Sequence, residues 1–131
     1  MPDSDLMFRS AIELAGMVRA GEVSSRELVE ISLARIAELN PKLNAFVDVD
    51  PERALATAEA VESGDERPFA GVPIAIKNNR SLKDWRLTYG CSLMKDFVAN
   101  RDHNVVRRLN LNPPHNLVEG IDRRVDDSDR G

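Results

Sequence analysis

Apolar residues recur at helical spacing in the N-terminal part of the chain and predict three helices. The first begins at a Ser10–Glu13 capping box, in which the serine accepts from the Glu13 amide and the glutamate reaches back to the serine backbone. Gly21 predicts the end of this helix, because glycine readily adopts the left-handed conformation found at helix ends. Ile12, Ala15 and Val18 lie at helical spacing within this segment.

The second and third helices have start and stop signals of their own. Ser24 or Ser25 can cap the second, but only Ser24 has a glutamate three residues later, and Asn40-Pro41 predicts its end. The third helix starts with Asp50 as N-cap and Pro51 at its first position, and Ser63-Gly64 predicts its end. Its predicted buried face is Ala54, Leu55, Ala58 and Val61.

Two short stretches predict strands. Residues Phe46 to Val49 lie in a segment of alternating character, and Val72 to Lys77 is an apolar run that ends in a lysine. Both faces of the second run are apolar, as in a strand that is covered on both sides. Lys77 shares its face with the small or cyclic residues Pro73 and Ala75, which leaves room for partners to approach the ammonium group.

The rest of the chain is less regular. The segment from Asn78 to Phe97 predicts a loop with turns, and "RDHNVVRRL" predicts the start of a helix with Asp102 as its cap. From Asn110 onward the periodicity is lost and Pro113-Pro114 follows, so we expect a partial domain over residues 1–109 and a divergent, flexible tail over 110–131.

Composition and charge exclude several classes of function. The chain has 131 residues, of which 42% are hydrophobic, so it can form a core. Its net charge of -4 and its short Arg-Arg pairs argue against binding to nucleic acid or an anionic membrane. A single cysteine, Cys91, and an acidic N-terminus predict a cytoplasmic protein without a signal peptide. His103 and His115 are isolated, so no metal site and no cofactor are expected.

Four segments, in order, resemble the N-terminal part of an amidase-signature hydrolase. They are "AGEVSSRELVEISLARIAELNPKLNAFVDVD", "PFAGVPIAIKNN", "LTYGCS" and "RDHNVVRRL". The order and spacing match from about residue 10 to residue 109, and the Gly-x-Pro-x-x-x-Lys strand is the most specific part. The resemblance implies an α/β fold class: the N-terminal part of the amidase-signature fold, with three helices and a small, incomplete mixed sheet.

The resemblance also implies a chemistry. The family hydrolyses amides, or transfers ammonia from glutamine, with a serine nucleophile, a second serine with a cis peptide bond, and a lysine. Lys77 matches the position of that lysine, which acts as general base. Burial at the end of an apolar strand would favour the neutral amine that a base requires. From its spacing alone, Lys77 can equally be a solvated residue just past a strand end.

Three departures from the family pattern bear on activity. Asn78 stands where the family usually has Asp or Glu, and Cys91 replaces a serine in the Thr88–Cys91 turn. The Gly- and Ser-rich run that holds both catalytic serines is missing, and the only Ser-Ser pair, Ser24-Ser25, lies at a helix start. Cys91 lies in a predicted loop with no histidine in a supporting motif, so we interpret it as an inert thiol.

These observations lead to two hypotheses. The first is a truncated amidase-signature hydrolase that is inactive alone and whose full-length relatives act on small-molecule amides. The second is a non-catalytic interaction module or subunit remnant. In both, uncovered sheet and helix surfaces would favour self-association. Asp102 and His103 are expected to start a helix rather than form an acid–base pair, and Trp85 to pack in a loop.

Overall fold

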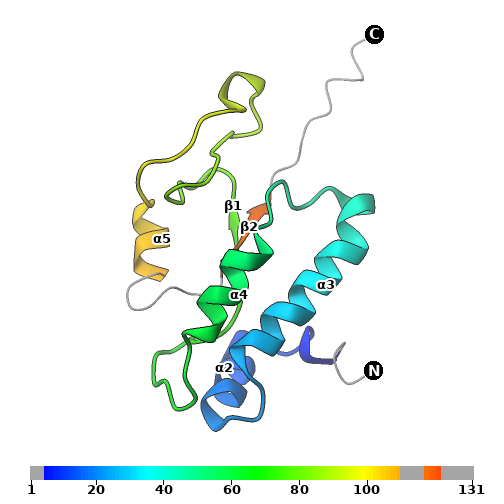
Figure 1. Ribbon diagram of the computed structural model, residues 1–131, viewed down its shortest axis with the longest axis vertical. Coiled ribbons are helices and arrows are strands. Elements are labelled where there is room, and N and C mark those ends of the chain that lie inside the picture. The colour runs from blue at the N-terminus through cyan, green and yellow to red at the C-terminus, as the bar shows by residue number, and fades with distance from the viewer. Residues whose placement is uncertain (1–4, 110–116, 122–131) are drawn as a thin grey trace.

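The computed structural model describes residues 5–109 and 117–121, and in the last segment only the backbone. The described part is mainly helical (Figure 1). Its elements in chain order are α2 (Ala11–Ala20), α3 (Ser25–Leu43), α4 (Pro51–Glu59), β1 (Ile74–Lys77), the 3₁₀ helix η1 (Ser92–Met94), α5 (Asn104–Leu109) and β2 (Leu117–Ile121). Within these segments, no helix has the length and apolar character that crossing a membrane requires.

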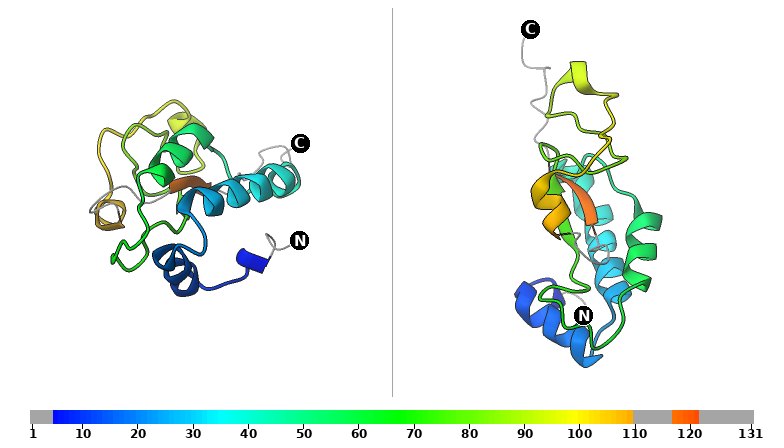
Figure 2. Two further views of the ribbon diagram at one scale, coloured as in Figure 1. Left: turned by 60° about the horizontal axis from the view of Figure 1, so that its bottom comes forward. Right: turned by 90° about the vertical axis from the view of Figure 1, so that its left-hand side faces the viewer.

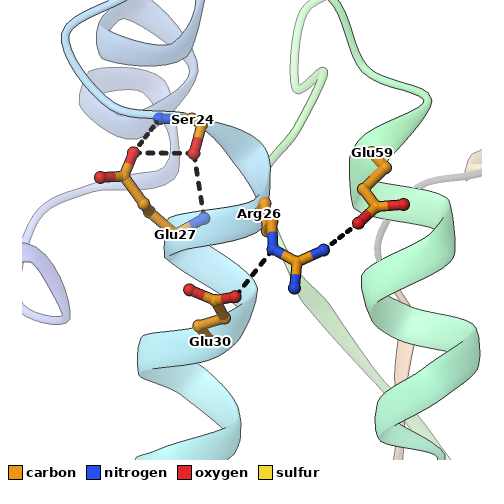
Figure 3. Close-up of polar contacts among 5 residues, drawn as sticks. All are labelled: Ser24, Arg26, Glu27, Glu30 and Glu59. Atoms are coloured by element: carbon orange, nitrogen blue, oxygen red, sulfur yellow. Dashed lines mark hydrogen bonds and ion pairs between the residues drawn. The ribbon is translucent and has the colours of Figure 1, made fainter.

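The three predicted N-terminal helices are present, and both capping boxes form. At the start of α2, Ser10 accepts from the Glu13 amide and Glu13 accepts from the Ser10 backbone. At the start of α3, Ser24 accepts from the Glu27 amide and Glu27 accepts from the Ser24 backbone and hydroxyl (Figure 3). Gly21 ends α2 with φ 73°. These helix starts are predictable because every group involved lies within four residues of the others.

The predicted end of α3 at Asn40-Pro41 is wrong, because the helix continues to Leu43. Pro41 lies in the last turn, where it removes only one backbone hydrogen bond. The Asn44 amide donates to the Asn40 carbonyl at 2.8 Å, and Asn44 ends the helix with φ 49°.

The same asparagine explains why the predicted strand over Phe46 to Val49 does not form. The Asn40 side chain accepts from the Phe46 amide at 2.8 Å and donates to the Phe46 carbonyl at 2.9 Å. Both backbone groups of Phe46 are therefore engaged and cannot pair with a neighbouring strand. The segment is irregular instead.

Helix α4 begins as predicted and ends earlier than predicted. The Asp50 carboxylate accepts from the Arg53 amide at 3.0 Å, with Pro51 at the first helical position. The helix stops at Glu59, before Ser63-Gly64. The Gly64 amide donates to the Arg19 carbonyl of α2 at 3.1 Å, so contact with α2 draws the chain away from the helix axis.

Helices α3 and α4 lie side by side and are joined by buried and exposed contacts (Figure 1). Val29 packs against Ala54 and Ala58 in a buried cluster. On the surface, Arg26 pairs with Glu59 of α4 and donates to Glu30 of its own helix at 2.8 Å (Figure 3). These three charged side chains are about half exposed, so their pairs contribute roughly 1 kcal/mol or less.

A glycine anchors the segment that leads into β1. Gly71 has φ 80°, and a Cβ built there would lie 2.8 Å from Val18 Cγ1 and 3.1 Å from Ser25 Cβ. The buried Ser25 hydroxyl donates to the Gly71 carbonyl at 3.0 Å. The Gly-x-Pro turn is therefore packed onto the junction between α2 and α3, and this contact sets where β1 begins.

The described strands form one parallel pair in place of the predicted mixed sheet. Ile74 pairs with Leu117 and Ala75 with Val118, and the register shifts between Ile76 and Lys77. Strand β2 lies in the segment for which we predicted a tail without regular structure, so that expectation is wrong for 117–121. Residues 110–116 and 122–131 lie outside the described residues.

The strand pair lies between α5 on one side and α3 and α4 on the other (Figure 2), but Ala75 and Lys77 of β1 remain exposed. Ile76 is buried with Leu82, Trp85 and Val106 of α5. A separate cluster joins α2 to the start of α3, namely Leu14, Val18, Val23 and Leu28. The core thus consists of small clusters, and the described residues do not enclose both faces of β1.

Candidate functional site

Lys77 is the last residue of β1 and its side chain is exposed. The prediction that it would be buried is wrong, because Ala75 and Lys77 face away from the cluster around Ile76 and no described segment covers them. The Lys77 carbonyl accepts from the amides of Asn79 at 2.7 Å and Arg80 at 3.0 Å, so the chain turns sharply after the strand. The backbone around the lysine is thus well held, while its ammonium group lies in solvent.

Asn78 connects the end of β1 to the Thr88–Cys91 turn. Its side chain is 1% exposed, and its Oδ1 accepts from the Thr88 amide at 2.7 Å. Its carbonyl accepts from the Tyr89 amide at 3.2 Å. From the sequence, Asn78 is only a lost charge beside the lysine, but in the structure it is the residue that brings two family segments together.

The turn itself contains two consecutive left-handed residues, Tyr89 with φ 52° and Gly90 with φ 68°. The Cys91 amide donates to the Thr88 carbonyl at 2.8 Å. The Cys91 thiol is exposed. The interpretation of this thiol as inert stays a prediction.

One atom of Asn78 lacks a partner. Its Nδ2 is buried and makes no hydrogen bond within the described part of the chain. Leaving a buried amide group unpaired costs about 1–3 kcal/mol of folding free energy. Because Oδ1 accepts from the Thr88 amide, it is the Nδ2 group that lacks a partner. Sequence reasoning missed this role of Asn78, because the Thr88 amide that it accepts from lies ten residues further along the chain.

The serines of the described helices have structural contacts. Ser24 caps α3, and Ser25 donates to Gly71. Ser32 donates to the Leu28 carbonyl at 2.8 Å. The Ser24-Ser25 pair is therefore part of the scaffold, as its position at a helix start predicts.

Asp102 and His103 have structural roles, but the predicted cap is wrong. The Asp102 carboxylate accepts from the Lys83 amide at 2.7 Å instead of capping α5. His103 Nδ1 accepts from the Val105 amide at 3.2 Å, and the His103 carbonyl accepts from Arg107. Trp85 is a packing residue, as predicted, with the Arg53 guanidinium 5.4 Å from its ring centre.

Three carboxylates of the described chain have lowered pKa values, namely Glu13, Glu27 and Asp65. Arg67 hydrogen-bonds to the Asp65 carboxylate and lowers the pKa of Asp65 to about 2. The Ser10 and Ser24 amides at the capping boxes lower the pKa values of Glu13 and Glu27. Within the described segments, no group of three His, Cys, Asp or Glu side chains is placed to hold a metal ion.

A groove lies between α3 and the segment that enters β1. Its volume is about 290 Å³, and Ile36, Leu39, Leu43, Ile74 and Ala75 are among its lining residues. It borders the strand that leads to Lys77 and opens to solvent. An apolar surface of this kind marks a place where another segment can pack.

Comparison with known proteins places these features in a family. The sequence profile of the amidase family matches residues 27–118, from the start of α3 into β2, and so includes Lys77, Asn78 and the Thr88–Cys91 turn. The chain belongs to the amidase-signature family. The resemblance inferred from the sequence is thereby confirmed.

Relatives of known description are much longer than this chain. A glutamyl-tRNA(Gln) amidotransferase subunit of Methylobacillus flagellatus is 40% identical over 109 residues, which are 80% of this chain and 22% of that protein. The corresponding subunit of Thiobacillus denitrificans is 44% identical over 99 residues, 72% of this chain and 20% of its own. The chain therefore spans about a fifth of the length of these curated relatives.

A solved structure shows the shared fold. An amidase family protein from Bacillus anthracis strain Ames superposes with a TM-score of 0.80 at 23% identity, over 92% of this chain and 25% of that chain. The described elements therefore hold the arrangement of one part of the amidase-signature fold.

Proposed function

We propose that this chain is a truncated amidase-signature hydrolase that supplies the lysine-bearing part of an acyl-transfer site and is inactive alone. The observation that supports it best is the contact of Asn78 with the Thr88–Cys91 turn, within the segment that matches the family. This contact joins the end of the lysine strand to a second family motif. The reaction class is hydrolysis of a carbon–nitrogen amide bond.

In this proposal Lys77 is the general base, and its exposure is one reason to expect that the isolated chain is inactive. The exposed Lys77 side chain lies in water, without the covering layer that a general base requires in this proposal. A covering layer would remove water from the amine and favour its neutral form. The nucleophile would have to come from a serine-rich segment that this sequence lacks.

The proposal predicts that the isolated chain has no amide hydrolase activity. We expect the 131-residue chain to show no turnover of small aliphatic or aromatic amides, or of glutamine, above the background of a Lys77→Ala variant. Removal of a nucleophile costs orders of magnitude in rate. Ammonia release measured with a coupled assay tests this. Turnover that the Lys77→Ala variant abolishes would contradict the proposal.

A second candidate function is a non-catalytic interaction module or subunit remnant, which the open groove beside α3 favours. The two functions differ in whether they require Lys77. A catalytic remnant needs the lysine once the site is completed, whereas an interaction module binds its partner equally well with alanine there.

A further inference from the structure

The groove beside α3 is lined by apolar residues that remain partly or largely exposed. Leu43 lines it and is 66% exposed, and Ala75 on β1 is exposed as well. Ile36 and Leu39 are only half-buried although they face the strand segment. Residues that pack between a helix and a strand are normally buried, so no described segment of the chain fully covers this surface.

The chemistry of the groove restricts what can cover it. Arg35 is the one charged residue among those that line it, and it already pairs with Glu38 at 2.6 Å. The occupant must therefore present apolar side chains. Residues 110–116 and 122–131 offer only Leu111 and Val125 of the hydrophobic class, so their composition suits the groove poorly.

We propose that the occupant is the complementary part of an amidase-signature domain, the portion that this chain lacks relative to its family. The inference rests on the proposed function, since it names what completes the same site. Its support is the superposition over 92% of this chain but only 25% of the Bacillus anthracis protein. In that protein the corresponding elements belong to a far longer chain, and here they keep the same arrangement.

Co-expression tests the proposal with the chain as it exists. The 131-residue chain is produced with a form of the Methylobacillus flagellatus protein that lacks the 109 matched residues. We expect a one-to-one complex by size exclusion with light scattering. Leu43→Asp should reduce the recovered complex by roughly tenfold or more, because a buried charge would face apolar side chains.

Ile12→Asp is the matched control. Ile12 is 74% exposed and does not line the groove, so the same substitution should leave the complex intact. Both positions are exposed in the isolated chain, so neither variant should impair its folding. Circular dichroism of each variant checks this. Equal recovery with Leu43→Asp and wild type would overturn the assignment of the groove.

A fused protein answers the same question if the shortened Methylobacillus flagellatus protein is insoluble by itself. In the fusion, the 131-residue chain replaces the 109 matched residues of that protein. Leu43→Asp should then lower Tm by roughly 4 °C or more in the fusion and leave the isolated chain unchanged. An unchanged Tm in the fusion would overturn the proposal.

Three further outcomes are informative. A discrete homodimer that Leu43→Asp abolishes, and that the shortened protein does not displace, would assign the groove to a second copy and overturn the proposal. A complex or stable fusion without amide turnover would support the groove assignment and contradict the proposed function. Turnover that Lys77→Ala removes while the complex persists would support both.

Discussion

At Gly71, the backbone conformation and the close packing disfavour any residue that has a side chain. Its positive φ and the 2.8 Å approach of a built Cβ to Val18 Cγ1 leave no space for a side chain. The contact cannot relax easily, because Val18 and Ser25 are both buried. This one position links α2, α3 and the entry to β1.

We expect Gly71→Ala to lower the free energy of unfolding by about 2 kcal/mol or more, through backbone strain and overpacking. Gly16→Ala is the matched control, since nothing lies within 4 Å of a Cβ there and alanine favours a helix. Urea denaturation measures both. A Gly71→Ala variant as stable as wild type would show that the Gly-x-Pro turn is free to move.

Asn78 gives a prediction with a defined pH dependence. In Asn78→Asp one carboxylate oxygen can still accept from Thr88, but the other occupies the buried place of the unpaired Nδ2. Burial disfavours the anion, so the pKa of this new aspartate lies above its unfolded value of about 3.9. The folded state therefore binds the proton more tightly than the unfolded state.

This difference in proton binding sets the direction in which stability changes with pH. Near pH 4 and below, Asn78→Asp should approach the stability of wild type, and the variant should lose roughly 2 kcal/mol as pH rises through the folded pKa. Urea denaturation at pH 4 and pH 7 tests this against wild type at each pH. A stability difference that does not change with pH would mean that a donor or water meets the second oxygen.

At the scale of elements, burial holds α3 against α4 more strongly than charge does. Val29 is 0% exposed between Ala54 and Ala58, whereas the Arg26–Glu59 pair is about half exposed. Apolar area removed from water outweighs an ion pair that remains hydrated.

Val29→Ala should therefore destabilise the chain by about 2 kcal/mol, through lost burial and the cavity left behind. Glu59→Gln should change stability by roughly 0.5 kcal/mol or less, and addition of salt should reduce that difference further. Thermal denaturation at low and high salt compares them. Equal losses for the two variants would indicate that the surface pair is a main link between the helices.

At the scale of the whole molecule, the described residues leave apolar surface in contact with water. Phe8, Ile12 and Leu93 are 84%, 74% and 92% exposed, and β1 pairs only with β2 among the described strands. The core is divided into small clusters rather than one continuous core. These features favour marginal stability and association between chains.

We propose that the isolated chain self-associates through its sheet and helix surfaces and that the complementary segment suppresses this association. A net charge of -4 opposes contact only weakly, since physiological salt screens repulsion beyond about 8 Å. Sedimentation across a concentration series should show rising average mass. A monomer at all concentrations, with a cooperative thermal transition, would show that the chain closes its own core.

The sequence by itself determined the features that depend on near neighbours. The Ser-x-x-Glu boxes at Ser10 and Ser24 and the Asp50-Pro51 start of α4 form as predicted. The Gly-x-Pro strand ending in Lys77, together with the motifs around it, was enough to identify the family. A cap or a turn involves groups only a few residues apart, so local composition decides it.

The tertiary structure decided what depends on distant groups. The Asn40 side chain bonds both backbone groups of Phe46, so a predicted strand does not form. The Arg19 carbonyl accepts from the Gly64 amide, beyond the end of α4. Strand β1 pairs with β2, which lies much further along the chain. The exposure of Lys77 and the contact from Asn78 to Thr88 likewise follow from which segments lie nearby. Periodicity describes which face of an element is apolar, but only packing between remote segments decides what covers that face and which buried groups find partners.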